Sequence, residues 1–246
     1  MALPSIQSPD WQHARRAFLL GFSSALTSVL GVVLFVTFLG VGAFSHDAGF
    51  SLGWALAGSL FVWAAPAQII LISTMHAGAS VLESALAVTL SAIRLLPMVV
   101  AVLPMLRTAQ TRLRDLALPA HFTAITFWVE AFRLLPLVPR QARIAFSNGL
   151  GVGFVSVCLV STTIGYGLAA KLPPILAAGV LALTPLVFLL SSARNAHRFV
   201  DKAGLVLGLI FYPLISIYLH TGVDILLSGV SAGTIAYGAH RLRRRR

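Results

Sequence analysis

The chain has 246 residues, of which 58% are apolar and 10% are charged, and its mean hydropathy is +0.90. Soluble domains average about 45–50% apolar and about 25% charged residues, so this composition excludes a soluble globular enzyme, and it is too apolar for a disordered chain. The net charge of +11 is not accompanied by base-reading or stacking residues on a basic surface, so no nucleic-acid binding is predicted. The class that remains is an integral membrane protein.

Eight apolar segments follow one another along the chain. They cover residues 17–44, 51–75, 81–106, 118–138, 146–170, 172–193, 203–219 and 223–237. These segments do not alternate between apolar and polar positions, and lipid requires every backbone polar group to be paired within its segment, so all eight are predicted to be helical. We therefore expect an all-α integral membrane protein, a polytopic bundle of about eight membrane segments. The first segment is too long for a cleavable signal peptide and is predicted to be one transmembrane helix.

The length leaves no room for a separate soluble domain, because each span needs about 20 residues. A single permease domain over residues 1–246 is expected. Residues 1–16 would form a cytoplasmic N-terminal segment, and residues 241–246, which are rich in arginine, would form a basic cytoplasmic tail. Excess Lys and Arg marks the cytoplasmic side of a membrane protein. Both termini are therefore predicted to be cytoplasmic.

One loop disagrees with this orientation if every segment spans. Arg107, Arg112 and Arg114 would then lie outside, contrary to the rule that positive charge stays inside. The conflict disappears if segments 51–75 and 118–138 enter and return as broken, re-entrant helices. Both contain proline, which breaks a helix interior. Eight plain spans and a bundle with discontinuous or re-entrant segments stay as alternatives.

Glycine pairs at four-residue spacing occur in three segments. They are Gly149/Gly153, Gly204/Gly208 and Gly229/Gly233. In lipid this spacing lets helix backbones approach closely, so we expect these pairs at helix–helix contacts.

Arg94 is the foremost candidate for a substrate-binding residue. It lies in the middle of an apolar segment, where a charged side chain is costly and marks a functional site by default. A guanidinium binds a carboxylate with two parallel hydrogen bonds, which suits the carboxylate of a small solute. The alternative is a structural pair with an acidic side chain or with carbonyl groups of a broken helix.

Gln68 and Pro66 lie at the predicted break of segment 51–75, in the run Ala65-Pro66-Ala67-Gln68. Transporters often bind their substrates at such breaks. The Gln68 amide is expected either to pair the carbonyl groups freed by Pro66 or to contact the substrate, with Pro66 in the pocket wall.

Glu130 and Glu83 are the candidates for proton coupling. A carboxyl group removed from water can have its pKa raised toward neutrality and carry a proton during transport. Glu130 is three residues before Arg133, so a local ion pair on one helix face is the alternative interpretation. Glu83 lies near a segment end, and a solvated interfacial carboxylate is its alternative. No metal-ligand set and no phosphate-binding loop are found, so neither a cofactor nor enzymatic activity is predicted.

These motifs together resemble a known family. The break that ends in Gln68, the small-residue run 76–80, the stretch Ala92-Ile93-Arg94 with Pro104 ten residues beyond Arg94, and Thr126-Phe127 are similar to the AzlC-type large subunit of branched-chain amino-acid exporters. Met98 stands where this family commonly has Tyr, and we expect it in the substrate pocket.

The resemblance implies a subunit of a secondary transporter in the bacterial inner membrane. Its substrates would be amino acids, chiefly branched-chain ones, and transport would be export. It also implies a small membrane partner of the AzlD type. A permease for another small organic solute and an assembly subunit without a pathway of its own are the alternatives.

Overall fold

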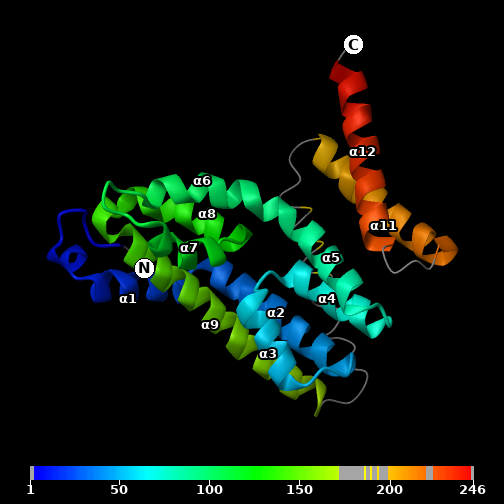
Figure 1. The fold of residues 1–246 in the computed structure, drawn as a ribbon, viewed down its shortest axis with the longest axis horizontal. Helices are drawn as coiled ribbons and strands as arrows, with labels where there is room; N and C mark the ends of the chain where they lie inside the picture. The colour runs from blue at the N-terminus through cyan, green and yellow to red at the C-terminus, as the bar shows by residue number, and fades with distance from the viewer. Residues whose placement is uncertain are drawn as a thin grey trace.

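The structure, a computed structural model, describes residues 3–171, 199–219 and 224–244, together with the isolated helical positions 186, 189 and 193. Every regular element within these ranges is a helix, which confirms the all-α fold (Figure 1). The α-helices are α1 (Ala14–Thr27), α2 (Val29–Asp47), α3 (Leu52–Phe61), α4 (Ala65–His76), α5 (Val81–Ala92), α6 (Leu96–Leu106), α7 (Ala117–His121), α8 (Ile125–Leu134), α9 (Arg143–Ala169), α11 (Phe199–Leu219) and α12 (Asp224–Arg244). Short 3₁₀ turns are η1 (Pro9–Gln12), η2 (Ile93–Leu95), η3 (Leu113–Leu116), η4 (Leu135–Leu137) and η5 (Arg140–Ala142).

The predicted segments are helical wherever the structure describes them, and segment 172–193 lies largely outside the described residues. Several segments are broken. The prediction of one continuous helix over residues 17–44 is wrong, because Ser28 adopts an extended conformation between α1 and α2 and its side chain caps α2 at the Gly31 N–H group. Segment 81–106 bends by 55° between α5 and α6, where Pro97 is in the first turn of α6.

Among the described helices, three are long and apolar enough to cross a membrane: Val29–Asp47, Arg140–Ala169 and Phe199–Tyr218. The bent pair of α5 and α6 makes a fourth when it is taken as one span. Segments 51–75 and 118–138 consist of shorter helices, α3 with α4 and α7 with α8. The two segments for which a re-entrant course was an alternative are therefore each built from short helices, as is segment 81–106.

Helix α9 forms the centre of the molecule and packs closely along α1 and α2. A Cβ atom added to Gly149 would overlap the backbone carbonyl group of Phe18, and one added to Gly165 would overlap that of Leu39. These contacts place the first half of α1 beside the start of α9 and the second half of α2 beside the end of α9, so α1 and α2 run in the same direction as α9. The prediction that Gly149 and Gly153 mark a close helix contact is confirmed.

The segment from α3 to α4 leaves one end of the molecule and returns to it. Helix α2 ends at Asp47, and the imidazole Nδ1 of His76, the last residue of α4, donates to the carbonyl oxygen of Ala48 at 3.3 Å. Both ends of this segment therefore lie beside the C-terminus of α2. This is the geometry of a re-entrant hairpin.

The segment from α7 to α8 does the same at the opposite end. Arg143, the first residue of α9, donates from Nη1 to the carbonyl oxygen of Met105 and from Nε to that of Val138, both at 2.9 Å. The end of α6 and the end of the α8 segment are therefore joined at the N-terminus of α9. Residues 107–138 leave this end of the molecule and come back to it.

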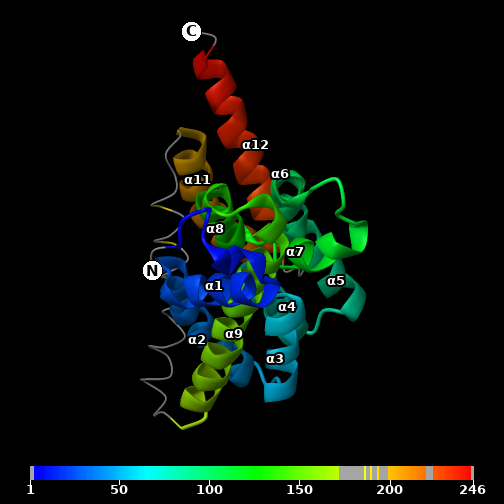
Figure 2. The same ribbon diagram turned by 90° about the vertical axis from the view of Figure 1, so that its left-hand side faces the viewer.

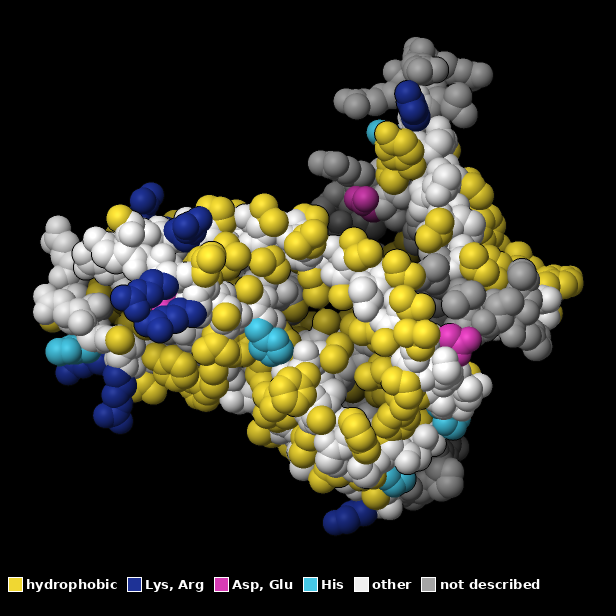
Figure 3. Space-filling view, viewed as in Figure 1, with side chains coloured by type: hydrophobic (Ala, Val, Ile, Leu, Met, Phe, Trp, Pro, Cys, Tyr) yellow, Lys and Arg dark blue, Asp and Glu magenta, His cyan; other side chains and the backbone are white. Residues whose placement is uncertain are grey.

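The loop that contains Arg107, Arg112 and Arg114 therefore lies at the same end of the molecule as the first residues of α1 and α9. In Figure 3 most of the visible Lys and Arg side chains gather there, and apolar side chains cover much of the remaining visible surface. The exposed arginines at this basic end are Arg15, Arg16, Arg107, Arg112, Arg114 and Arg140. If every segment crossed the membrane, the loop arginines would lie on the outer side. In this fold they lie with the other basic residues, so this conflict does not arise.

Helices α11 and α12 pack on each other as a hairpin that projects from the body of the molecule in both views (Figures 1 and 2). The buried face of α12 is formed by Ser228, Ala232 and Ala236, and Ala236 lies 4.0 Å from a Cβ atom built on Gly204. Gly208, Gly229 and Gly233 have no atom of the described residues within 4 Å of such a Cβ. The close packing predicted at the glycines of α9 is therefore confirmed. In α12 the prediction of packing at Gly229 and Gly233 is wrong, because the buried face is a different one.

Candidate functional site: an apolar cavity inside a re-entrant hairpin

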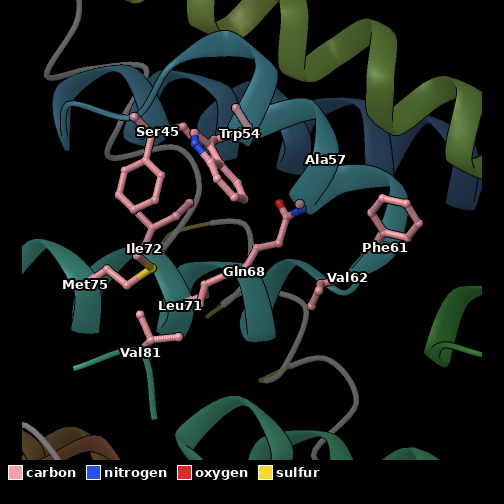
Figure 4. Close-up of a pocket in the computed structure, with 13 residues that line it drawn as sticks. Ser45, Trp54, Ala57, Phe61, Val62, Gln68, Leu71, Ile72, Met75 and Val81 are labelled. Atoms are coloured by element: carbon pink, nitrogen blue, oxygen red, sulfur yellow. The ribbon is translucent and has the colours of Figure 1, made fainter. Parts of the chain in front are cut away.

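A cavity of about 540 Å³ lies between α3 and α4 (Figure 4). This volume falls in the range of about 300–1,000 Å³ that is typical of small-molecule sites. The side chains around it are almost all apolar, with aromatic rings from the α3 side and aliphatic groups from α4. They belong to Ser45, Phe50, Trp54, Ala55, Ala57, Phe61, Val62, Gln68, Leu71, Ile72, Met75 and Val81, and Gly58 completes the wall.

Gln68 is the polar side chain at the centre of the cavity wall. It points from α4 toward α3 in Figure 4, and only 2% of its surface is exposed. Its Nε2 atom donates to the hydroxyl oxygen of Ser59 at 3.4 Å. Its Oε1 atom is buried and has no hydrogen-bond partner among the described residues. A buried oxygen without a hydrogen bond destabilises the folded protein by about 1–3 kcal/mol. A donor group of a solute inside the cavity would offset this cost.

Ser59 connects this amide to the central helix. Its hydroxyl group lies 3.1 Å from the carbonyl oxygen of Ala55 and 2.9 Å from the hydroxyl oxygen of Thr162 in α9. Ser59 and Thr162 are both fully buried. Helices α3, α4 and α9 are thus joined by one short polar chain at the base of an otherwise apolar cavity.

Local sequence explains why the hairpin turns where it does. Residue 64 is extended, and α4 begins at Ala65 with Pro66 in its first turn, where the missing N–H group of proline costs no helical hydrogen bond. The preceding residue Trp63 is 4% exposed and stacks on Phe154 of α9, with ring centroids 6.4 Å apart. The turn is therefore held at the middle of α9.

The two re-entrant segments meet at their tips. The indole Nε1 of Trp63 donates to the carbonyl oxygen of His121 at 3.1 Å, and Nε2 of His121 donates to the carbonyl oxygen of Leu60 at 3.2 Å. Beside them, Phe122 lies against Gly151 of α9, where a Cβ atom would overlap its ring. We call the two hydrogen bonds among Leu60, Trp63 and His121 the tip latch. It satisfies a carbonyl group that each short helix leaves free at its C-terminus.

Among the predicted substrate-binding residues, Gln68 lies on the cavity wall and Pro66 begins α4 beside it. Arg94 is in η2, at the bend between α5 and α6, and Met98 is in α6. Met98 is not among the lining residues that the structure describes. The structure thus joins Gln68 to the cavity and places Arg94 at a second helix break.

The predicted proton-coupling residues are in different surroundings. Glu130 is 4% exposed, and its Oε2 atom accepts from Nε of Arg133 at 2.6 Å, while the Arg133 side chain is 61% exposed. Glu83 is exposed in the first turn of α5, where its carboxylate accepts from the backbone N–H and the hydroxyl group of Ser80 at 2.7 and 2.8 Å. This reciprocal capping of the α5 N-terminus is a sufficient structural reason for a glutamate at position 83.

Sequence reasoning missed Ser59, Thr162 and His121 as parts of the site. A small hydroxyl residue in an apolar helix usually bonds to the carbonyl group four residues earlier, so Ser59 and Thr162 carry no distinctive signal. His121 lies near the start of segment 118–138, and its sequence surroundings gave it no role.

The molecule is an all-helical membrane protein that holds an apolar cavity within a discontinuous, re-entrant segment, an architecture found in transport proteins. The AzlC protein family matches residues 29–172, which run from α2 through α9, and the chain belongs to this family. AzlC proteins are related to branched-chain amino-acid transport and in general act with a partner subunit. Comparisons with curated proteins and with solved structures give no match.

Proposed function

We propose that this protein is the large subunit of an inner-membrane secondary transporter that exports amino acids with branched or similar apolar side chains. The observation that carries the proposal is the cavity between α3 and α4, which combines an aromatic and aliphatic wall with the buried amide of Gln68. Such a site takes an apolar side chain and orients the polar part of the solute with few contacts. A small membrane subunit of the AzlD type would complete the exporter.

The basic end of the molecule is proposed to be cytoplasmic, in agreement with the positive-inside rule. The cavity would then open in the half of the membrane away from the cytoplasm, because its walls lie toward the far ends of α2 and α4. The arginine-rich C-terminus supports the same orientation, and both termini are proposed to be cytoplasmic.

Arg94 is proposed to bind the carboxylate of the solute along the path. Its position at the 55° bend between α5 and α6 supports this role, because helix breaks are where transporters expose polar groups to a path through the membrane. Glu130, a buried carboxylate paired with Arg133, is proposed to carry a proton, with Glu83 as a second candidate.

Efflux from cells tests the proposal. Cells that lack other exporters are loaded with leucine, isoleucine, valine or methionine, and release is measured with this chain and its partner present. Gln68→Leu and Arg94→Ala are each expected to lower efflux by at least about tenfold, since a lost hydrogen bond to a charged group costs about 1.5–3 kcal/mol. The matched controls Gln141→Leu and Arg107→Ala alter exposed residues of the same types and should leave efflux unchanged.

Unchanged efflux in Arg94→Ala, with normal amounts of protein in the membrane, would remove its assigned role. The scaffold alternative predicts that a cysteine placed at position 68 or 98 is inaccessible to polar thiol reagents. An exporter with a solvated cavity predicts labelling at position 68, and protection from labelling by leucine.

A further inference from the structure

The polar end of the cavity has a defined direction, which follows from the hydrogen bonds of Ser59. Its hydroxyl group carries one proton. The Ser59 hydroxyl group donates this proton to the Ala55 carbonyl oxygen, 3.1 Å away. In this arrangement Ser59 accepts from Gln68 and from Thr162.

This count orients the amide of Gln68. Its nitrogen faces Ser59, and its oxygen faces away from Ser59. A flipped amide would bring an oxygen up to a hydroxyl group that has no proton left to donate. Gly58 leaves room for this orientation, because a Cβ atom there would lie 3.0 Å from Gln68 Nε2. The acceptor Oε1 is therefore wholly unpaired in the cavity wall, and Nε2 keeps a second N–H group beside the one that it gives to Ser59.

The rest of the described lining favours a cation over an anion. No charged side chain belongs to it, and the hydroxyl group of Ser45 donates to the Val41 carbonyl oxygen within its own helix at 2.8 Å. The neutral donors in the wall are the indole N–H of Trp54, a largely exposed residue, and the second N–H of the Gln68 amide. The rings of Phe50, Trp54 and Phe61 add π faces, which attract ammonium groups and repel carboxylates.

We propose that this cavity recognises the amino group of an apolar amino acid, with Gln68 Oε1 as its hydrogen-bond acceptor, and that it does not require the carboxylate. The cavity is then a site for branched aliphatic primary amines, of which the branched-chain amino acids are one class. This inference rests on the proposed export function. It assigns the amino end of the solute to the cavity, whereas Arg94 is proposed to contact the carboxylate elsewhere on the path.

Three leucine-like compounds separate the two ends of the solute. Leucine has both charged groups, 3-methylbutylamine has the amino group only, and 4-methylpentanoate has the carboxylate only. Binding of each to the purified full-length protein with its partner, in lipid nanodiscs, is measured by calorimetry and by competition with labelled leucine. We expect the amine to bind within about tenfold of leucine and the acid to bind at least about tenfold more weakly than the amine.

Substitutions at position 68 test the contact itself. Gln68→Met keeps the size of the side chain and removes the strong acceptor, so the preference for amine over acid should fall about 5- to 100-fold, the range expected for one unmet hydrogen bond. Gln68→Glu supplies a charged acceptor and should strengthen amine binding. Gln141→Met, at an exposed glutamine, is the matched control and should keep the wild-type preference. Thermal unfolding of each variant identifies a folding defect, and Gln68→Glu decides the outcome if Gln68→Met fails to fold.

An acid that binds as well as the amine, or a preference that survives Gln68→Met, would overturn this inference. If leucine is still exported in that case, the proposed function stands and the direction of recognition is wrong. If the wild-type protein neither binds nor exports leucine, the proposed function fails, and the comparison of amine with acid still decides the chemistry of the cavity.

Discussion

Replacing Gly149 with alanine tests whether α1 and α9 are in backbone contact. The added Cβ atom would lie 2.7 Å from the carbonyl carbon of Phe18 and would overlap its oxygen. Ordinary van der Waals contact begins at about 3.4 Å, so the helices must separate by more than about 0.7 Å, because the carbonyl oxygen is closer than the carbon. The neighbouring atoms belong to backbone on both sides, and no flexible side chain can move out of the way.

The size of the effect follows from that separation. A gap of about 0.5–1 Å removes a quarter to a half of the dispersion energy of the atoms concerned, and overpacking a tight interface costs about 1–3 kcal/mol. We expect Gly149→Ala to lower the free energy of unfolding by about 2–3 kcal/mol, which corresponds to a fall in melting temperature of about 4–12 °C for a chain of this length.

Cys158 supplies the assay. It is the single cysteine of the chain and is fully buried in α9, so a thiol-reactive fluorophore labels the purified protein only as it unfolds. The control is Gly167→Ala in the same helix, where no atom of the residues that the structure describes lies within 4 Å of a Cβ atom. Its melting temperature should be unchanged or slightly higher. Equal melting temperatures for the two variants would refute the backbone contact.

Three further substitutions test other contacts. Arg143→Met removes both hydrogen bonds that join the basic end and should lower the melting temperature by several degrees, whereas Arg140→Met, at an exposed position, should not; equal effects would contradict the joining role. Glu130→Gln should abolish the pH dependence of efflux if this carboxyl group carries the proton, and an unaltered pH profile excludes it as the carrier. His121→Leu removes the donor to Leu60 and should cost about 1 kcal/mol of stability, while His121→Gln, which keeps a donor, should recover most of it in the same thermal assay.

Charge placement indicated re-entrant hairpins as one of two alternatives. Three arginines on the wrong side of a plain eight-span bundle favoured a re-entrant course for segments 51–75 and 118–138. Pro66 marked the break of the first segment, whereas the break of the second, at residues 122–124, contains no proline. The bend at residues 93–95 was missed although Pro97 follows it in the middle of the predicted segment, where proline breaks a helix. The break at Ser28 was missed because serine in an apolar run usually bonds within its own helix.

The connections between segments could not be predicted from local sequence. Ser59 and Thr162 are 103 positions apart, and His121 is 61 positions from Leu60, so their pairing depends on how the short helices pack on α9. Gln68 was found because an amide beside a proline break is unusual at membrane depth. Its unpaired oxygen becomes evident only when the partner of its nitrogen is known.

The tip latch also bears on how easily the protein can change conformation. Helices α1, α2 and α9 are joined backbone to backbone and resist sliding, whereas the two re-entrant segments hold each other through two hydrogen bonds at their tips. Breaking both costs about 1–3 kcal/mol net. An energy gap of a few kcal/mol corresponds to a minor state that holds about 0.1–10% of the molecules. A state in which the tips have parted is thus within thermal reach, and a solute that bonds better to the parted tips than to the closed ones would increase its population without energy from a nucleotide.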